Sequence, residues 1–115
     1  MRRGEIRYAD LEPARGSEAG KVRPVVVVSN NGANAAAAAR GRGVVTIVPL
    51  TSNVDRVFDF QVLVPAVASG LPRDSKAQTE QVRSIDVRRL GPSVGALPSQ
   101  LVVELGHALR LHLGL

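Results

Sequence analysis

The chain of 115 residues has the length of one compact domain, because a single hydrophobic core usually serves about 100–150 residues. Its 44% hydrophobic content is sufficient for a folded core, and the absence of cysteine excludes disulfide scaffolds, cysteine-ligated zinc and thiol nucleophiles. Fifteen basic residues, thirteen of them arginine, against ten acidic residues give a net charge of +5, which fits either a nucleic-acid-binding surface or a GC-rich coding background.

The first elements in chain order are two strands joined by a long loop. A strand is predicted over Glu5–Ala9, where inward and outward residues alternate with period two. The segment Leu11–Val22 has no such period, and a loop of that length inside a compact domain suggests a functional role. Pro24 opens the second strand, Val25–Val28, and its four consecutive valines indicate burial on both faces of a sheet.

The middle of the chain predicts a short helix and two further strands. The alanines Ala35–Ala39 are expected to form one or two helical turns after an N-cap at Asn34. Strands are predicted over Val44–Val48 and Phe60–Val64, because each apolar run is stopped by a proline.

The last third predicts one polar strand and a terminal helix. Ser75–Ile85 is expected to be a strand that faces solvent or a ligand, and Ser99 is expected to cap a helix with leucine at every fourth position. That helix either covers the core or forms a dimer contact. Several short strands followed by one helix indicate a single mainly β domain over residues 1–115, a small barrel or strongly bent sheet with the helix packed against it.

The long loop and the strand after it contain residues suited to phosphate binding. Ser17 offers a hydroxyl, and Arg15, Lys21 and Arg23 supply cations near the start of a rigid strand. The loop is not a P-loop, because the glycine and lysine spacing differs and no helix follows. Taken alone, an arginine before a buried strand is more often a solvated strand end than a catalytic group.

Two other segments carry polar groups with an ordinary structural explanation. Thr51, Ser52 and Asn53 follow a buried strand, where such residues usually form a turn, and Glu80–Asp86 matches a solvated face with local ion pairs. The two histidines, His107 and His112, are five residues apart and do not fit the spacing of a helical metal pair. Any nuclease chemistry would therefore depend on arginine and hydroxyl groups.

These segments, in this order, resemble the MazF/PemK family of toxin endoribonucleases. The matching stretches are Arg3–Ile6, Asp10–Glu18, Arg23–Asn30, Val48–Ser52, Phe60–Val62 and Glu80–Ile85. Together they span nearly the whole chain, and their order and spacing make the resemblance strong. The family fold, an SH3-like small barrel with a C-terminal α-helix packed against it, agrees with the predicted elements.

The resemblance implies an endoribonuclease toxin that uses no metal or cofactor. Such an enzyme cuts single-stranded RNA at a short sequence, leaves a 2′,3′-cyclic phosphate and a 5′-hydroxyl, and inhibits translation and growth. It implies Arg23 and Thr51 as the catalytic pair, with Arg23 stabilising charge on the phosphoryl oxygens and Thr51 orienting the phosphate. The group that removes the 2′ proton stays open. The substrate contacts implied are Ser17, Glu18, Ser52, Gln81 and Arg83.

The same resemblance implies partners and a location. The family forms homodimers that a cognate MazE-like antitoxin inhibits by laying an acidic, flexible tail over the RNA groove, and the net charge of +5 suits such a tail. A cytoplasmic protein without membrane contact is expected, because no apolar run approaches about 20 residues and the N-terminus leads into no signal-type segment. The chain departs from the family at Ala35–Ala39, at residues 54–59 and at Gln78 and Thr79, so the cleavage sequence is not implied.

Two alternatives share this fold. One is a gyrase-poisoning toxin without nuclease activity, a class that relies on an aromatic residue near its C-terminus, whereas this chain ends in Leu113, Gly114 and Leu115. The other is an inert SH3-like module that binds RNA without cutting it.

Overall fold

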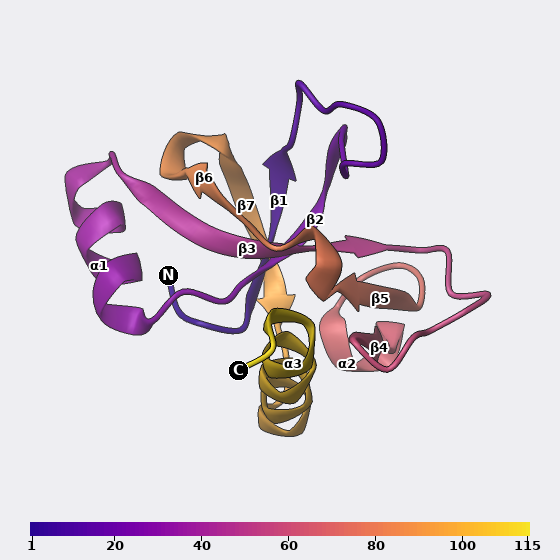
Figure 1. Ribbon diagram of the computed structural model, residues 1–115. Helices are drawn as coiled ribbons and strands as arrows, with labels where there is room; N and C mark the ends of the chain where they lie inside the picture. The colour runs from indigo at the N-terminus through magenta and orange to yellow at the C-terminus, as the bar shows by residue number, and fades with distance from the viewer.

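The computed structural model describes residues Met1–Leu115 and consists of one bent antiparallel sheet with helices around it (Figure 1). The seven strands are β1 (Glu5–Asp10), β2 (Val22–Val27), β3 (Val44–Thr51), β4 (Gln61–Val64), β5 (Ser75–Gln78), β6 (Arg83–Asp86) and β7 (Leu90–Ala96). The helices are α1 (Asn31–Arg40), α2 (Ala66–Ser69) and α3 (Ser99–Leu113), with short 3-10 helices η1 (Thr79–Gln81) and η2 (Val87–Arg89). None of these helices combines the length and apolar character needed to cross a bilayer.

The strand order is β4-β5-β3-β2-β1-β7, and β6 pairs with the first half of β3. β3 is therefore shared: its residues Val44–Ile47 face β6, while Leu50 and Thr51 face β5. Because β4 and β7 each end the pairing path, the sheet stays open and does not close into the predicted barrel. The predicted mainly β architecture with a C-terminal helix is confirmed.

The four valines of the second strand divide the hydrophobic interior into two parts. Val26 and Val28 contact the cluster that α3 covers through Leu105, which is 2% exposed. Val25 and Val27 point to the opposite face, into the cluster next to α1. Burial on both faces is thus confirmed, and α3 is a core element of the chain.

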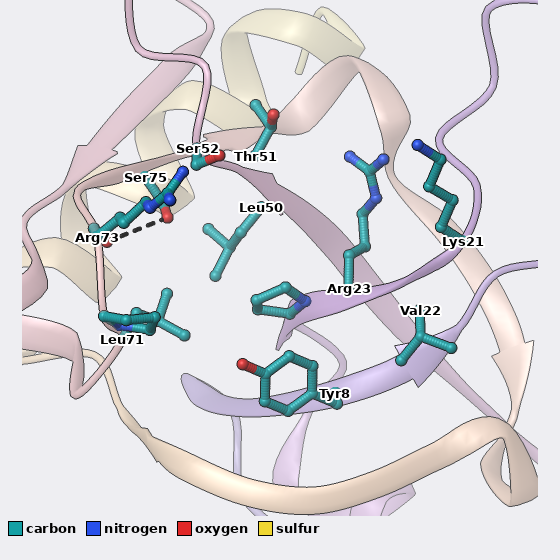
Figure 2. Close-up of a pocket in the computed structure, with 12 residues that line it drawn as sticks. Tyr8, Lys21, Val22, Arg23, Leu50, Thr51, Ser52, Leu71, Arg73 and Ser75 are labelled. Atoms are coloured by element: carbon teal, nitrogen blue, oxygen red, sulfur yellow. Dashed lines mark hydrogen bonds between the residues drawn. The ribbon is translucent and has the colours of Figure 1, made fainter.

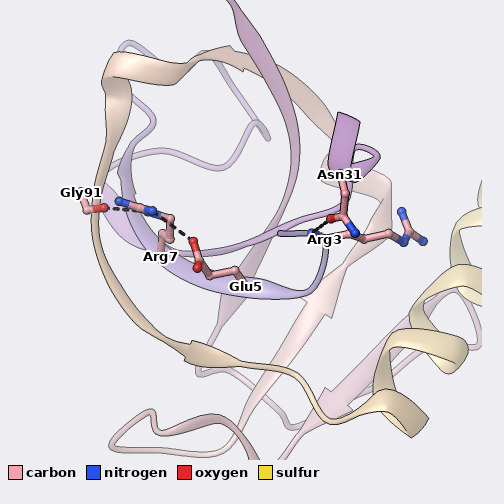
Figure 3. Close-up of polar contacts among 5 residues, drawn as sticks. All are labelled: Arg3, Glu5, Arg7, Asn31 and Gly91. Carbon is pink, nitrogen blue, oxygen red and sulfur yellow. Dashed lines mark hydrogen bonds and ion pairs between the residues drawn. The ribbon is translucent and has the colours of Figure 1, made fainter. Parts of the chain in front are cut away.

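Two arginines near the N-terminus serve the fold (Figure 3). Arg7 on β1 donates from Nε to the carbonyl of Gly91 on β7 at 2.9 Å and forms an ion pair with Glu5 at 3.0 Å. Arg3 donates from Nη1 of its guanidinium to the carbonyl of Val28, and its backbone N–H donates to Asn31 at the start of α1 at 2.7 Å. Part of the basic content is therefore structural and not available for binding a polyanion.

The start of α1 differs from the prediction. Asn30, not Asn34, is the N-cap, and its side chain accepts the N–H of Ala33 at 2.8 Å. Asn34 lies within the helix, fully buried, and its Nδ2 donates to the carbonyl of Ser29 at 2.8 Å. The cap prediction was wrong because a capping residue needs extended backbone angles, and the chain has those at Asn30.

Three strand boundaries were also wrong. β2 begins at Val22, so Pro24 lies inside the strand, opposite Tyr8, and does not open it. β3 continues through Pro49 to Thr51, because Pro49 lies in the gap between β6 and β5, where a strand residue without an N–H leaves no ladder bond unmade. The expected single strand Ser75–Ile85 is two strands, β5 and β6, interrupted by η1.

Two elements in the second half of the chain were not predicted from the sequence. β7 escaped prediction because its two glycines and one proline obscure the alternation, and α2 was missed because it is a single turn. Ser99 opens α3 but forms no capping hydrogen bond, since Pro98 occupies the cap position.

Gly95 of β7 marks a place where the backbone of α2 leaves no room for a side chain. A Cβ at this position would lie 2.6 Å from the carbonyl oxygen of Ser69. We expect Gly95→Ala to lower the free energy of unfolding by about 1–3 kcal/mol through overpacking, measured by urea denaturation. Ser93→Ala, at an exposed position of the same strand, is the control and should change it by less than about 0.5 kcal/mol. Equal stability of the two variants would contradict the close approach.

Candidate active site

A cleft of about 310 Å³ opens between the start of β2, the end of β3 and the loop before β5 (Figure 2). Three of its lining residues are charged, and all three are cations: Lys21, Arg23 and Arg73. The remaining lining residues are Tyr8, Val22, Pro24, Leu50, Thr51, Ser52, Leu71, Pro72 and Ser75. With no carboxylate among the lining residues, the electrostatics of the cleft favour an anion.

Arg23 is held at one end of its guanidinium and free at the other. It lies on β2 opposite Ala9 of β1, and its Nε donates to the carbonyl of Gly20 at 2.8 Å. Its two terminal nitrogens form no hydrogen bond or ion pair within the chain and extend toward the end of β3 (Figure 2). This leaves a fork of N–H donors in the orientation that binds phosphate oxygens.

Thr51 ends β3 at the edge of the same cleft, in register with Lys76 of β5. Its Oγ1 accepts the N–H of Asn53 at 3.3 Å, which leaves its hydroxyl hydrogen free to donate. The turn expected at this segment is therefore present. Ser52, the next residue, also lines the cleft.

The loop between β1 and β2 brings Lys21 to the cleft, whereas its other cation, Arg15, is exposed and lies outside the lining. The carboxylate of Glu12 accepts the backbone N–H of Lys21 at 2.5 Å and that of Ala14 at 3.2 Å. Gly20 permits this packing, because a Cβ there would lie 2.6 Å from Glu12 Oε1. Lys21 itself has φ 65°, a left-handed conformation that costs a non-glycine residue about 1–2 kcal/mol.

The other predicted substrate contacts lie outside the lining of the cleft. The side-chain amide of Gln81 holds the loop between β1 and β2 by two hydrogen bonds. Its Nε2 donates to the carbonyl of Ser17 and its Oε1 accepts the N–H of Ala19, both at 2.9 Å. The Glu18 carboxylate accepts a backbone N–H of the same loop at 2.6 Å. Arg83 lies half-buried on β6. The structure thus brings together three of the seven predicted site residues: Arg23, Thr51 and Ser52.

Three polar residues of the lining were not singled out from the sequence. Tyr8 comes from β1 and turns its hydroxyl into the cleft (Figure 2). Arg73 comes from the segment that joins α2 to β5, and Ser75 is the first residue of β5. Arg73 lies fifty positions from Arg23 in a loop without periodicity. Its proximity depends on the pairing of β5 with β3, which no local pattern could indicate.

An ion pair between Arg88 and Asp86 lies away from the cleft. Arg88 donates to both carboxylate oxygens of Asp86, from Nε at 2.9 Å and from Nη2 at 2.8 Å, and these bonds hold the pKa of Asp86 well below its usual range. The ion pair therefore joins Asp86 to a residue beyond the Glu80–Asp86 segment, and no ion pair forms within that segment. The chain has no group of three or more His, Cys, Asp or Glu side chains placed to hold a metal ion.

Comparison with known proteins agrees with this geometry. Residues 2–113 match the profile of the PemK-like, MazF-like toxins of type II toxin-antitoxin systems. Endoribonuclease MazF9 of Mycobacterium tuberculosis is 55% identical over 115 residues, which cover 100% of this chain and 98% of that protein.

Two solved structures share the fold. MazF from Deinococcus radiodurans aligns with a TM-score of 0.81 at 24% identity, over 100% of this chain and 97% of that one. An endoribonuclease in complex with its cognate antitoxin, from a mycobacterial species, aligns with a TM-score of 0.76 at 23% identity, over 100% and 96%.

The open antiparallel sheet with a C-terminal helix is therefore the fold of the MazF toxins. The chain belongs to the PemK-like, MazF-like toxin family, as the motifs in its sequence indicated. The gyrase-poisoning alternative receives no support from these relatives.

Proposed function

We propose that this chain is an endoribonuclease toxin that cleaves single-stranded RNA at a short sequence without a metal or cofactor. The observation that carries the proposal is the cleft itself, in which the unpaired end of the Arg23 guanidinium and the Thr51 hydroxyl lie among cations. The 55% identity to an endoribonuclease, over 98% of that protein, supports it.

The proposed reaction is an attack by the ribose 2′-oxygen on the adjacent phosphorus. The 2′-oxygen loses its proton and bonds to phosphorus, the bond from phosphorus to the 5′-oxygen breaks, and that 5′-oxygen takes up a proton. A 2′,3′-cyclic phosphate and a 5′-hydroxyl result. Negative charge grows on the non-bridging phosphoryl oxygens, and Arg23 stabilises it through two N–H donors while Thr51 holds the phosphate.

Recognition of the strand is proposed to depend on charge and hydrogen bonds. Of the chain's three aromatic residues only Tyr8 lines the cleft, which leaves little surface for base stacking. Ser52 contacts the substrate directly in this proposal. Ser17, Glu18, Gln81 and Arg83 contribute from the loop and strand beside the cleft.

The proposal extends to partners and location. The chain acts as a homodimer in the cytoplasm, with residues 1–115 forming one toxin domain. A cognate antitoxin with an acidic, flexible tail inhibits it, because such a tail competes with RNA for the three cations of the cleft. The solved complex of an endoribonuclease of this fold with its cognate antitoxin supports the expectation of an antitoxin partner.

The most informative test is to incubate the purified chain with a long RNA in EDTA and to sequence the resulting ends. We expect cuts at one short sequence, with cyclic phosphate on the upstream fragment and hydroxyl on the downstream fragment. The Arg23→Ala protein serves as the control for a contaminating nuclease. Intact RNA, or cuts that require added magnesium, would contradict the proposal.

A further inference from the structure

The cleft has a further arginine, Arg73, on the wall opposite Arg23. The roles proposed for Arg23 and Thr51 do not explain its presence there. Arg73 lies on the loop before β5, and its side chain extends toward Ser52 on the side away from Arg23 (Figure 2). In that view Leu50 lies between the two arginines. The two guanidinium groups therefore form separate binding points and not one cluster.

The backbone of the Arg73 loop is firmly held. Leu71 is buried in the core, and its N–H donates to a side-chain oxygen of α2 at 3.1 Å. Ser75, which is 5% exposed, donates to the carbonyl of Arg73 at 3.4 Å. The neighbouring carboxylate of Asp74 accepts the first N–H of α2 at 2.8 Å. The loop is thus a fixed base from which the arginine side chain can extend.

The Arg73 side chain, in contrast, has no partner within the chain. It is exposed, it takes part in neither of the two ion pairs, and the other charged groups of the cleft, Lys21 and Arg23, are also positive. Three like charges around one cleft repel one another until an anion enters. A strand with one negative charge per nucleotide would neutralise both walls at once.

We propose that Arg73 binds a phosphate adjacent in the RNA to the one that is cleaved. This inference rests on the proposed RNA cleavage. When the reacting phosphate is bound at Arg23 and Thr51, an RNA strand that crosses the cleft brings a neighbouring phosphate to the opposite wall. There the Arg73 guanidinium can donate two hydrogen bonds to the oxygens of that phosphate. Arg73 is a positioning residue: it holds the strand so that the 2′-oxygen stays aligned with the bond that breaks.

The test combines a protein change with a matching substrate change. Oligonucleotides carry the cleavage sequence with one flanking phosphate, upstream or downstream, replaced by a neutral methylphosphonate, and the reference oligonucleotide carries the same sugars with normal phosphates. The proteins are wild type, Arg73→Ala, Arg73→Lys and Arg40→Ala. Arg40→Ala is the matched control, because Arg40 is exposed at the end of α1, away from the cleft, and its loss changes the net charge equally (Figure 1).

For wild type and Arg40→Ala, we expect one of the two methylphosphonates to lower kcat/KM by about 10- to 100-fold, the range of a charge-assisted hydrogen-bonded contact. Arg73→Ala should show the same loss on the reference oligonucleotide and no further loss with that methylphosphonate. Arg73→Lys should recover part of the rate, since it keeps the charge without the fork.

Several results would overturn the inference. Wild-type rates for Arg73→Ala, or a full additional loss with each methylphosphonate in that variant, would show that Arg73 contacts no flanking phosphate. A merely structural role would lower all rates without abolishing the methylphosphonate effect. If wild type cleaved no substrate, the proposed function itself would fail, and this inference with it.

Discussion

Arg23→Ala should lower RNA cleavage by at least about 100- to 1,000-fold while leaving the fold intact. The expected size follows from the loss of preorganised donors at the point where negative charge develops. The fold should survive because Arg23 is only half-buried and its one internal bond, to the carbonyl of Gly20, lies at the surface end of β2. The measurement is single-turnover cleavage of a short RNA, with circular dichroism and a thermal melt to verify folding.

Two further variants separate charge from geometry at this position. Arg23→Lys keeps the positive charge but presents a single ammonium, so it should recover only a small part of the lost rate. Arg40→Ala removes one positive charge from α1 and should cleave like wild type. A folded Arg23→Ala protein with wild-type activity would remove Arg23 from the mechanism.

Thr51→Val should lower the cleavage rate by about 10- to 1,000-fold. Valine matches threonine in shape and favours a strand, so the pairing with Lys76 should persist while the hydroxyl is lost. The Thr51 hydroxyl accepts the N–H of Asn53 and donates to no group of the chain, so its hydrogen is free to bind the phosphate. Thr51→Ser keeps that donor and should stay within about tenfold of wild type.

A control for Thr51→Val is available on the same strand. Thr46→Val removes the hydroxyl that lies 3.3 Å from Ser84 Oγ, on the part of β3 that pairs with β6. It should leave both kcat and KM unchanged. If Thr51→Val were equally active, the phosphate contact would have to be reassigned to Ser52, the adjacent hydroxyl in the cleft.

Local patterns were sufficient for much of the fold. The valine run Val25–Val28 predicted a strand buried on both faces, because consecutive β-branched residues suit a sheet with apolar groups above and below it. The leucine repeat predicted α3. Prediction failed at Pro49, where the outcome depended on which strands lie beside it, and at Asn34, because the extended backbone angles of a cap fall at Asn30.

For the site, the sequence alone determined the chemical groups and excluded others. The absence of cysteine and the spacing of His107 and His112 left arginine and hydroxyl groups as candidates, and the resemblance to the MazF/PemK family implied Arg23 and Thr51 among them. Both the chemistry of each side chain and the order of the motifs can be read from the sequence, so neither requires knowledge of the fold.

Only the tertiary structure decided which of these groups share a cleft. It brought Arg73 and Tyr8 to Arg23, and it used Gln81 to hold a loop and Arg7 to join β1 to β7. The physical reason is that residues far apart in the sequence come together through the register of paired strands, here β3 with β2 and with β5. That register is selected because it buries the apolar side chains on both faces of the sheet throughout the domain. Net charge was therefore a weak guide, because the fold determines which arginines form bonds within the chain and which remain free for a phosphate.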